Sequence, residues 1–159
     1  MTPEILGRTV LLGMGATLVL DVFSLLRKHL QGIPALNYAM VGRWLVGLAA
    51  GRLALTPHSP PARGETALGW IAHYAIGVAL AATLPLFWGP AWLAEPTVPP
   101  ALAVGVLSVS APWLILQPAL GAGLAARHAA RPWLARGRSL LAHAVFGLGL
   151  YLTAWLMAR

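Results

Sequence analysis

The sequence contains no cysteine and very few charged residues. The absence of cysteine from its 159 residues excludes disulfides, thiol catalysis, thiolate metal sites and haem attached through cysteine. Charged residues make up only 9% of the chain, whereas a soluble domain carries about 25%. Apolar residues make up 58%, which is more than one soluble core of this size can bury. Lipid accepts such a surface, so the composition predicts an integral membrane protein.

Acidic residues are also scarce, which leaves a net charge of +7. In a soluble protein this excess of Lys and Arg would indicate nucleic-acid binding. Here the basic residues gather in two predicted loops, so membrane topology explains them and we expect no nucleic-acid partner. The four acids are Glu4, Asp21, Glu65 and Glu95.

Four apolar runs are close to the length of about 20 residues that crosses the hydrocarbon core of a bilayer. They cover residues 9–26, 66–88, 101–126 and 139–158. None alternates in polarity as a barrel strand would. The predicted fold is therefore an all-α integral membrane protein. It is a four-transmembrane-helix bundle that forms a single membrane domain over residues 1–159.

The predicted loops differ in charge, and this difference orients the chain. The connection over residues 89–100 has no Lys or Arg, and we expect Trp88 and Trp92 to anchor it at the membrane interface. The positive-inside rule places the two basic loops in the cytoplasm and both termini in the periplasm. Anionic lipid headgroups are expected to bind the basic loops. The loop residues are Arg27, Lys28, Arg43, Arg52 and Arg63, followed by Arg127, Arg131, Arg136 and Arg138.

The segment over residues 37–55 is long enough to pass for a fifth span. However, a fifth span would put the two basic loops on opposite sides of the membrane. We therefore expect an interfacial or a re-entrant amphipathic helix, with Tyr38 and Trp44 at the level of the headgroups.

A short pattern, A-H-x-x-x-G, occurs at residues 72–77 and again at 142–147. Both predicted helices run in the same direction, so the chain could consist of two repeated hairpins. Small residues such as Gly147 and Gly149 could also provide the contact of a homo-dimer.

Small and polar residues recur at every fourth position of three spans, which places them near one face of each helix. One such series ends at Asp21, and two others contain His73 and His143. Together with Gln117 of the third span, these side chains are expected to lie ~7–14 Å below one membrane surface. Ionisable groups at such a depth indicate a functional site. The candidate intramembrane site is Asp21, His73, Gln117 and His143.

The third span contains Pro112 and Pro118, and each removes a backbone donor and disturbs the helix. A broken helix beside a polar layer is typical of transporters. The leading hypothesis is therefore transport of a small solute, or proton-linked transport.

Two alternatives remain open. The first is a membrane protein that binds haem b or a metal ion through His73, His143 and Asp21. The second is a structural or accessory subunit in which the same side chains only hold helices together. The chain has no P-loop, H-E-x-x-H or G-x-S-x-G motif. No catalytic residue is therefore assigned, and an enzymatic role is not favoured.

Five stretches carry a resemblance to a known family, and they cover residues 9–21, 37–45, 69–77, 117–123 and 138–152. They resemble an uncharacterised family of small bacterial inner-membrane proteins, a DUF2938-like domain of unknown function. The resemblance extends over nearly the whole chain. It implies a multi-pass protein of the bacterial inner membrane, and it implies no activity, cofactor or residue role.

Overall fold

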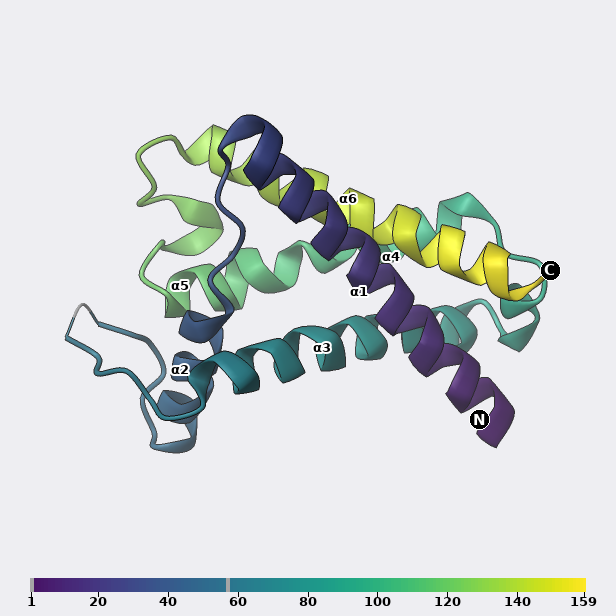
Figure 1. The fold of residues 1–159 in the computed structure, drawn as a ribbon, viewed down its shortest axis with the longest axis horizontal. Coiled ribbons are helices and arrows are strands. Elements are labelled where there is room, and N and C mark those ends of the chain that lie inside the picture. Colours follow the sequence, from purple (N-terminus) through teal and green to yellow (C-terminus); the bar gives the residue numbers. More distant parts are fainter. Residues whose placement is uncertain (1, 57) are drawn as a thin grey trace. The chain divides into compact units, whose positions relative to one another are not determined.

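The computed structural model describes residues 2–56 and 58–159, and it contains helices but no strand within those ranges (Figure 1). The helices longer than one or two turns are α1 (Pro3–Gln31), α2 (Tyr38–Ala49), α3 (Glu65–Phe87), α4 (Val98–Ser108) and α6 (Pro132–Met157). The short segments are η1 (Pro90–Leu93), η2 (Pro112–Leu116), α5 (Gln117–Ala119) and η3 (Leu124–Ala126).

Four helical stretches are long and apolar enough to cross a membrane, namely α1, α3, the stretch Val98–Ala119, and α6. The predicted all-α fold with four spans is confirmed. Large apolar side chains such as Leu11, Ile71, Leu107 and Leu156 are exposed on the four spans. In a bilayer, side chains in these positions contact lipid rather than water.

The helices do not end where the apolar runs end. The hydroxyl of Thr2 accepts a hydrogen bond from the N–H of Ile5, and α1 continues to a left-handed residue, Gly32. Because Arg and Lys favour helices, α1 extends past the apolar run. In the third span the helix stops at Ala119, whereas the apolar run continues to residue 126. Gly121 and Gly123 adopt φ values of 86° and 72°, which an α-helix does not allow.

The third span is irregular where its prolines lie. The α-helix stops at Ser108, and residues Pro112–Leu116 form a π-helical turn. The N–H of Gln117 bonds to the carbonyl of Pro112, five residues back. Pro112 has no N–H, so the carbonyl of Ser108 lacks its usual helical partner. Such π-turns occur frequently at functional sites.

Contacts divide the chain into two compact units. Unit 1 contains Met1–Ala35, Tyr74–Ser108 and Leu140–Arg159, and unit 2 contains Leu36–His73 and Val109–Ser139. Unit 1 therefore includes α1, α4 and most of α3 and α6. Unit 2 includes α2, the π-turn and the first turns of α3 and α6.

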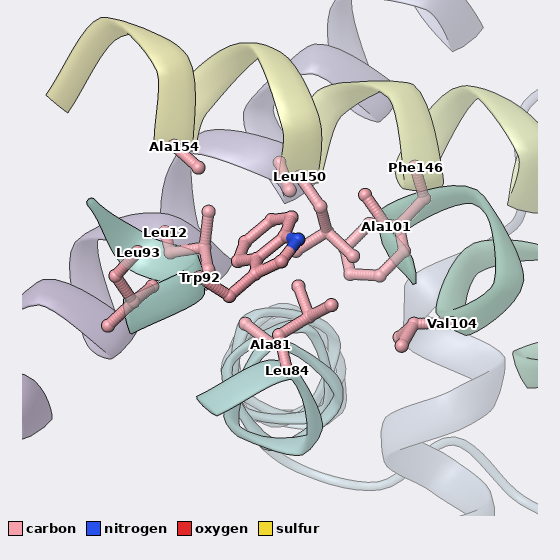
Figure 2. Packing of buried hydrophobic residues seen from close by; sticks show 11 residues of the cluster. Leu12, Ala81, Leu84, Trp92, Leu93, Ala101, Val104, Phe146, Leu150 and Ala154 are labelled. Atoms are coloured by element: carbon pink, nitrogen blue, oxygen red, sulfur yellow. The ribbon is translucent and has the colours of Figure 1, made fainter. Parts of the chain in front are cut away.

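The core of unit 1 forms around the indole ring of Trp92 (Figure 2). We expected Trp92 at the membrane interface, but it is only 6% exposed, whereas Trp88 is 47% exposed. Gly89, with φ of 83°, turns the chain into η1 and brings Trp92 and Leu93 back among the helices. The guanidinium of Arg8 donates to the carbonyl of Leu93 over 2.8 Å. The other members of the core cluster are Leu12, Ala16, Ala81, Leu84, Ala101, Val104, Phe146, Leu150 and Ala154.

Glycines bring the helices of unit 1 into backbone contact. Gly13 of α1 lies against Val78 of α3, and a Cβ atom on Gly105 of α4 would lie 2.5 Å from the Cα of Gly147 in α6. Gly149 faces Ala16 in the same way. Gly147 and Gly149 are therefore buried in contacts between helices of the chain.

Replacing Gly105 by alanine tests these contacts. The added methyl group would overlap the backbone of α6, and such overpacking costs about 1–3 kcal/mol. We expect Gly105→Ala to lower the melting temperature, which can be measured by tryptophan fluorescence in mild detergent.

Gly137→Ala is the matched control, because nothing lies within 4 Å of the new methyl group. Alanine also favours a helix over glycine by about 1 kcal/mol, so the melting temperature should stay constant or rise. Equal effects of the two changes would contradict the packing described for α4 and α6.

A candidate polar site within the spans

Asp21 and Tyr74 connect α1 to α3 within unit 1. The hydroxyl of Tyr74 donates a hydrogen bond to Oδ2 of Asp21 over 2.9 Å. Both residues are partly buried. One turn along α1, Thr17 lies against Gly77 of α3, and its hydroxyl donates to the carbonyl of Gly13. The close approach of the two backbones thus brings the tyrosine within reach of the carboxylate.

His143 and Ser108 make a second polar contact in unit 1, between α6 and α4. The hydroxyl of Ser108 lies 2.7 Å from Nδ1 of His143 and donates to the carbonyl of Gly105 over 2.6 Å. A hydroxyl has a single hydrogen to donate. If it goes to Gly105, Nδ1 of His143 carries the proton shared with Ser108, and Nε2 keeps its lone pair. Nε2 is then the ring atom of His143 that carries no hydrogen.

These two contacts lie at a similar level of unit 1. Helices α1 and α6 run antiparallel, and Ala16 faces Gly149 at their contact. Asp21 lies five residues beyond Ala16, and His143 lies six residues before Gly149. These separations correspond to ~7.5 Å and ~9 Å along the two helices. Asp21 and His143 therefore lie at similar distances along their helices from the contact between Ala16 and Gly149.

His73 belongs to unit 2, where it contacts α2. Its Nε2 lies 3.0 Å from the hydroxyl of Tyr38, and the two rings stack with centroids 4.3 Å apart. The rings of Trp70 and His73 meet edge to face, with their centroids 5.8 Å apart. Adjacent residues of a helix point about 100° apart. His73 and Tyr74 therefore project from different faces of α3.

Helix α2 is held against the beginning of α3 by two further contacts within unit 2. Gly42 and Gly69 bring the backbones together. Arg43 forms a bidentate ion pair with Glu65, with both N–O distances at 2.8 Å. The hydrogen bond with Glu65 raises the pKa of Arg43 above its ordinary value. At 12 residues, α2 is ~18 Å long, which is too short to cross the bilayer core.

Gln117, the fourth predicted side chain, follows the π-turn in unit 2. In the described part of the chain its Oε1 is buried without a hydrogen-bond partner, as is Nε1 of Trp113 four residues earlier. Within membranes, unsatisfied polar atoms are costly. Both atoms belong to the irregular segment between Pro112 and Pro118.

Over residues 2–56 and 58–159, no group of three or more His, Cys, Asp or Glu side chains is placed to hold a metal ion. Nε2 of His73 is one of the nitrogens that would coordinate a metal or haem iron, and it already lies at hydrogen-bond distance from Tyr38. The structure therefore adds no support for the haem or metal alternative.

The hydroxyl partners Tyr74, Ser108 and Tyr38 were not assigned to the site from the sequence. Tyr74 directly follows His73, so a search at four-residue spacing passes over it. Ser108 lies in the third span, which has no such series of small and polar residues at four-residue spacing. A search for hydroxyl residues in neighbouring spans, at the depth of each titratable group, would have selected Tyr74 and Ser108 as candidate partners.

A sequence profile described as "Protein of unknown function (DUF2938)" matches residues 10–157. No curated protein matches the chain, and no solved structure matches it.

The contact between Tyr74 and Asp21 can be tested with Tyr74→Phe, which removes only the hydroxyl. We expect a loss of about 1–2 kcal/mol in stability, which is typical of a hydrogen bond between membrane helices or to a charged group. In an Asp21→Asn background the same change should cost less, because the two residues interact. Thermal unfolding of the four variants measures this coupling.

Tyr151→Phe serves as the control, because the Tyr151 hydroxyl has no hydrogen bond within the described residues. Its effect should be close to zero. Additive effects of Tyr74→Phe and Asp21→Asn would show that the contact contributes nothing.

Proposed function

We propose that this chain, which belongs to the DUF2938 family of unknown function, is a proton-linked transporter of a small solute. The observation that carries the proposal is the hydrogen bond from Tyr74 to Asp21 between two spans. A carboxylate within an apolar span is costly, and such residues commonly mark ion pathways and proton relays. Asp21 is the group that takes up and releases the proton.

Protonation of Asp21 would weaken its contact with α3. A hydrogen bond to an ionised acceptor is roughly twice as strong as one between neutral groups. The bond from Tyr74 therefore holds α1 to α3 most firmly when Asp21 is charged. Nearby, Gly13 and Gly77 keep the two backbones in contact and provide a fixed point about which the helices can separate. Proton uptake is in this way coupled to a movement between two spans.

His143 is the second proton-binding group of the proposed cycle. Its Nδ1 is occupied by Ser108, so a proton would bind at Nε2. Asp21 and His143 belong to the same unit, and in the proposed cycle water carries the proton between them. Ser108 also lies next to the irregular part of the third span. Transporters often place their binding sites beside such breaks.

Reconstituted vesicles provide the test of proton movement. We expect an enclosed pH-sensitive dye to report proton entry into vesicles when a potassium diffusion potential is imposed, either alone or after addition of a panel of small organic ions. Asp21→Asn should abolish this entry, because an amide does not take up a proton in this pH range.

Glu95→Gln removes the same charge from an exposed turn outside the spans and should retain full activity. Wild-type vesicles that admit no more protons than empty vesicles would overturn the proposal. Equal flux through wild type and Asp21→Asn would do the same. If Asp21→Asn lowers only thermal stability, the accessory role is favoured. A Soret band or bound metal that disappears in His143→Ala would instead favour the cofactor alternative.

We further propose that the protein lies in the bacterial inner membrane with both termini in the periplasm. The support is the resemblance to a bacterial family and the distribution of charge, since the connection between α3 and α4 has no Lys or Arg. A periplasmic reporter enzyme fused after Arg159 should be active, and the same reporter inserted after Arg63 should be inactive. The reverse pattern would contradict the orientation.

A further inference from the structure

The connection that leads into α6 is strongly basic. Residues 127–138 contain four arginines and no acid. Two of these arginines are already used within unit 2. Nε of Arg127 bonds to His128 over 3.0 Å. Nε of Arg136 donates to the carbonyl of Ala125 over 2.7 Å, and its guanidinium lies 4.6 Å from the centre of the Trp133 ring.

The other two arginines, Arg131 and Arg138, remain available. Neither guanidinium has a hydrogen bond or an ion pair with any described residue of the chain. Both line one surface hollow of about 310 Å³ in unit 2. Arg131 immediately precedes α6, and its carbonyl accepts a hydrogen bond from the N–H of Ala135 over 3.1 Å. Leu134, Ala135 and Arg138 follow it at spacings of three, four and seven residues, so they lie on the same side of the helix. The remaining lining residues are Ala129 and Ala130.

The position of this hollow along α6 suggests what occupies it. The apolar run of the fourth span begins at residue 139, so the hollow lies at the boundary between membrane and water. Trp133 is 80% exposed and Leu134 is 43% exposed. An exposed tryptophan beside arginines is typical of the headgroup region of a bilayer. The hollow is lined almost entirely by apolar atoms. Arg131 and Arg138, which are exposed, contribute to this lining where phospholipid headgroups are found.

We propose that this hollow binds the headgroup of an anionic phospholipid, with its phosphate between Arg131 and Arg138. A guanidinium bonds phosphate oxygens in a bidentate manner. Leu134 and the alanines contact the glycerol and the first carbons of the acyl chains. A zwitterionic lipid carries its own cation beside the phosphate, so it binds less tightly. This proposal does not depend on the proposed transport activity.

Lipid titration of the full chain in mild detergent tests the site. We expect phosphatidylglycerol to raise the melting temperature and to remain bound in native mass spectrometry, and phosphatidylcholine to do neither at the same concentration. Arg131→Gln/Arg138→Gln should weaken phosphatidylglycerol binding about thirtyfold. The control is Lys28→Gln/Arg63→Gln, which removes two positive charges from the other basic loop. Because it lowers only the general attraction of the chain to anionic lipid, it should weaken phosphatidylglycerol binding far less than thirtyfold.

Three results would overturn the proposal. The first is equal stabilisation by the two lipids, and the second is equal loss of binding in the two double variants, which would indicate general attraction to charge. The third is equal stabilisation by inorganic phosphate, which would indicate a soluble anion. If the glutamine variant does not fold, Arg131→Lys/Arg138→Lys keeps the charge but removes the planar fork. It should still bind phosphatidylglycerol more weakly than wild type, and unchanged binding would contradict the site.

Discussion

The close approach of helix backbones at glycine is the constraint on which the other features depend. Lipid is as apolar as the helices, so the hydrophobic effect does not make them associate. Van der Waals contact and hydrogen bonds between the helices stabilise their association instead. In unit 1 this contact occurs where Gly105 meets Gly147 and where Gly13 meets Val78. In unit 2 it occurs where Gly42 meets the beginning of α3. Larger side chains at these positions would separate the helices and, with them, the polar groups nearby.

The contacts of Asp21 and His143 each lie close to a place where glycine brings two helix backbones together. The contact between Ser108 and His143 lies one turn from the crossing of Gly105 and Gly147, and the contact between Tyr74 and Asp21 lies beside Thr17 and Gly77. In each case a hydroxyl from a neighbouring helix satisfies the ionisable group. This arrangement lowers the cost of keeping the group within the membrane. A proton-linked role and a purely structural role share these contacts, and they differ in whether protonation moves the helices.

The sequence predicted the membrane class and the four spans because both depend on composition and length. It also predicted which faces of the spans would be in contact, because glycine and other small residues recur at helical spacing. The prediction that Trp92 lies at the membrane interface was wrong, because it rested only on the nearness of Trp92 to the end of a span. Only the turn at Gly89 decides that its ring enters the core of unit 1. The shared polar layer stays a prediction; within the units, Asp21 and His143 belong to unit 1, and His73 and Gln117 belong to unit 2.

By itself, the sequence determined that this chain spans a membrane, roughly where it does so, and which ionisable residues lie within the spans. These properties follow from the free energy of transferring each residue into lipid, which depends little on its neighbours. The tertiary structure alone decided the partners, namely Tyr74 for Asp21, Ser108 for His143 and Tyr38 for His73. Pairing depends on the angle at which helices cross and on the face of the helix from which each side chain projects. A shift of one residue, as between His73 and Tyr74, is enough to change the partner helix.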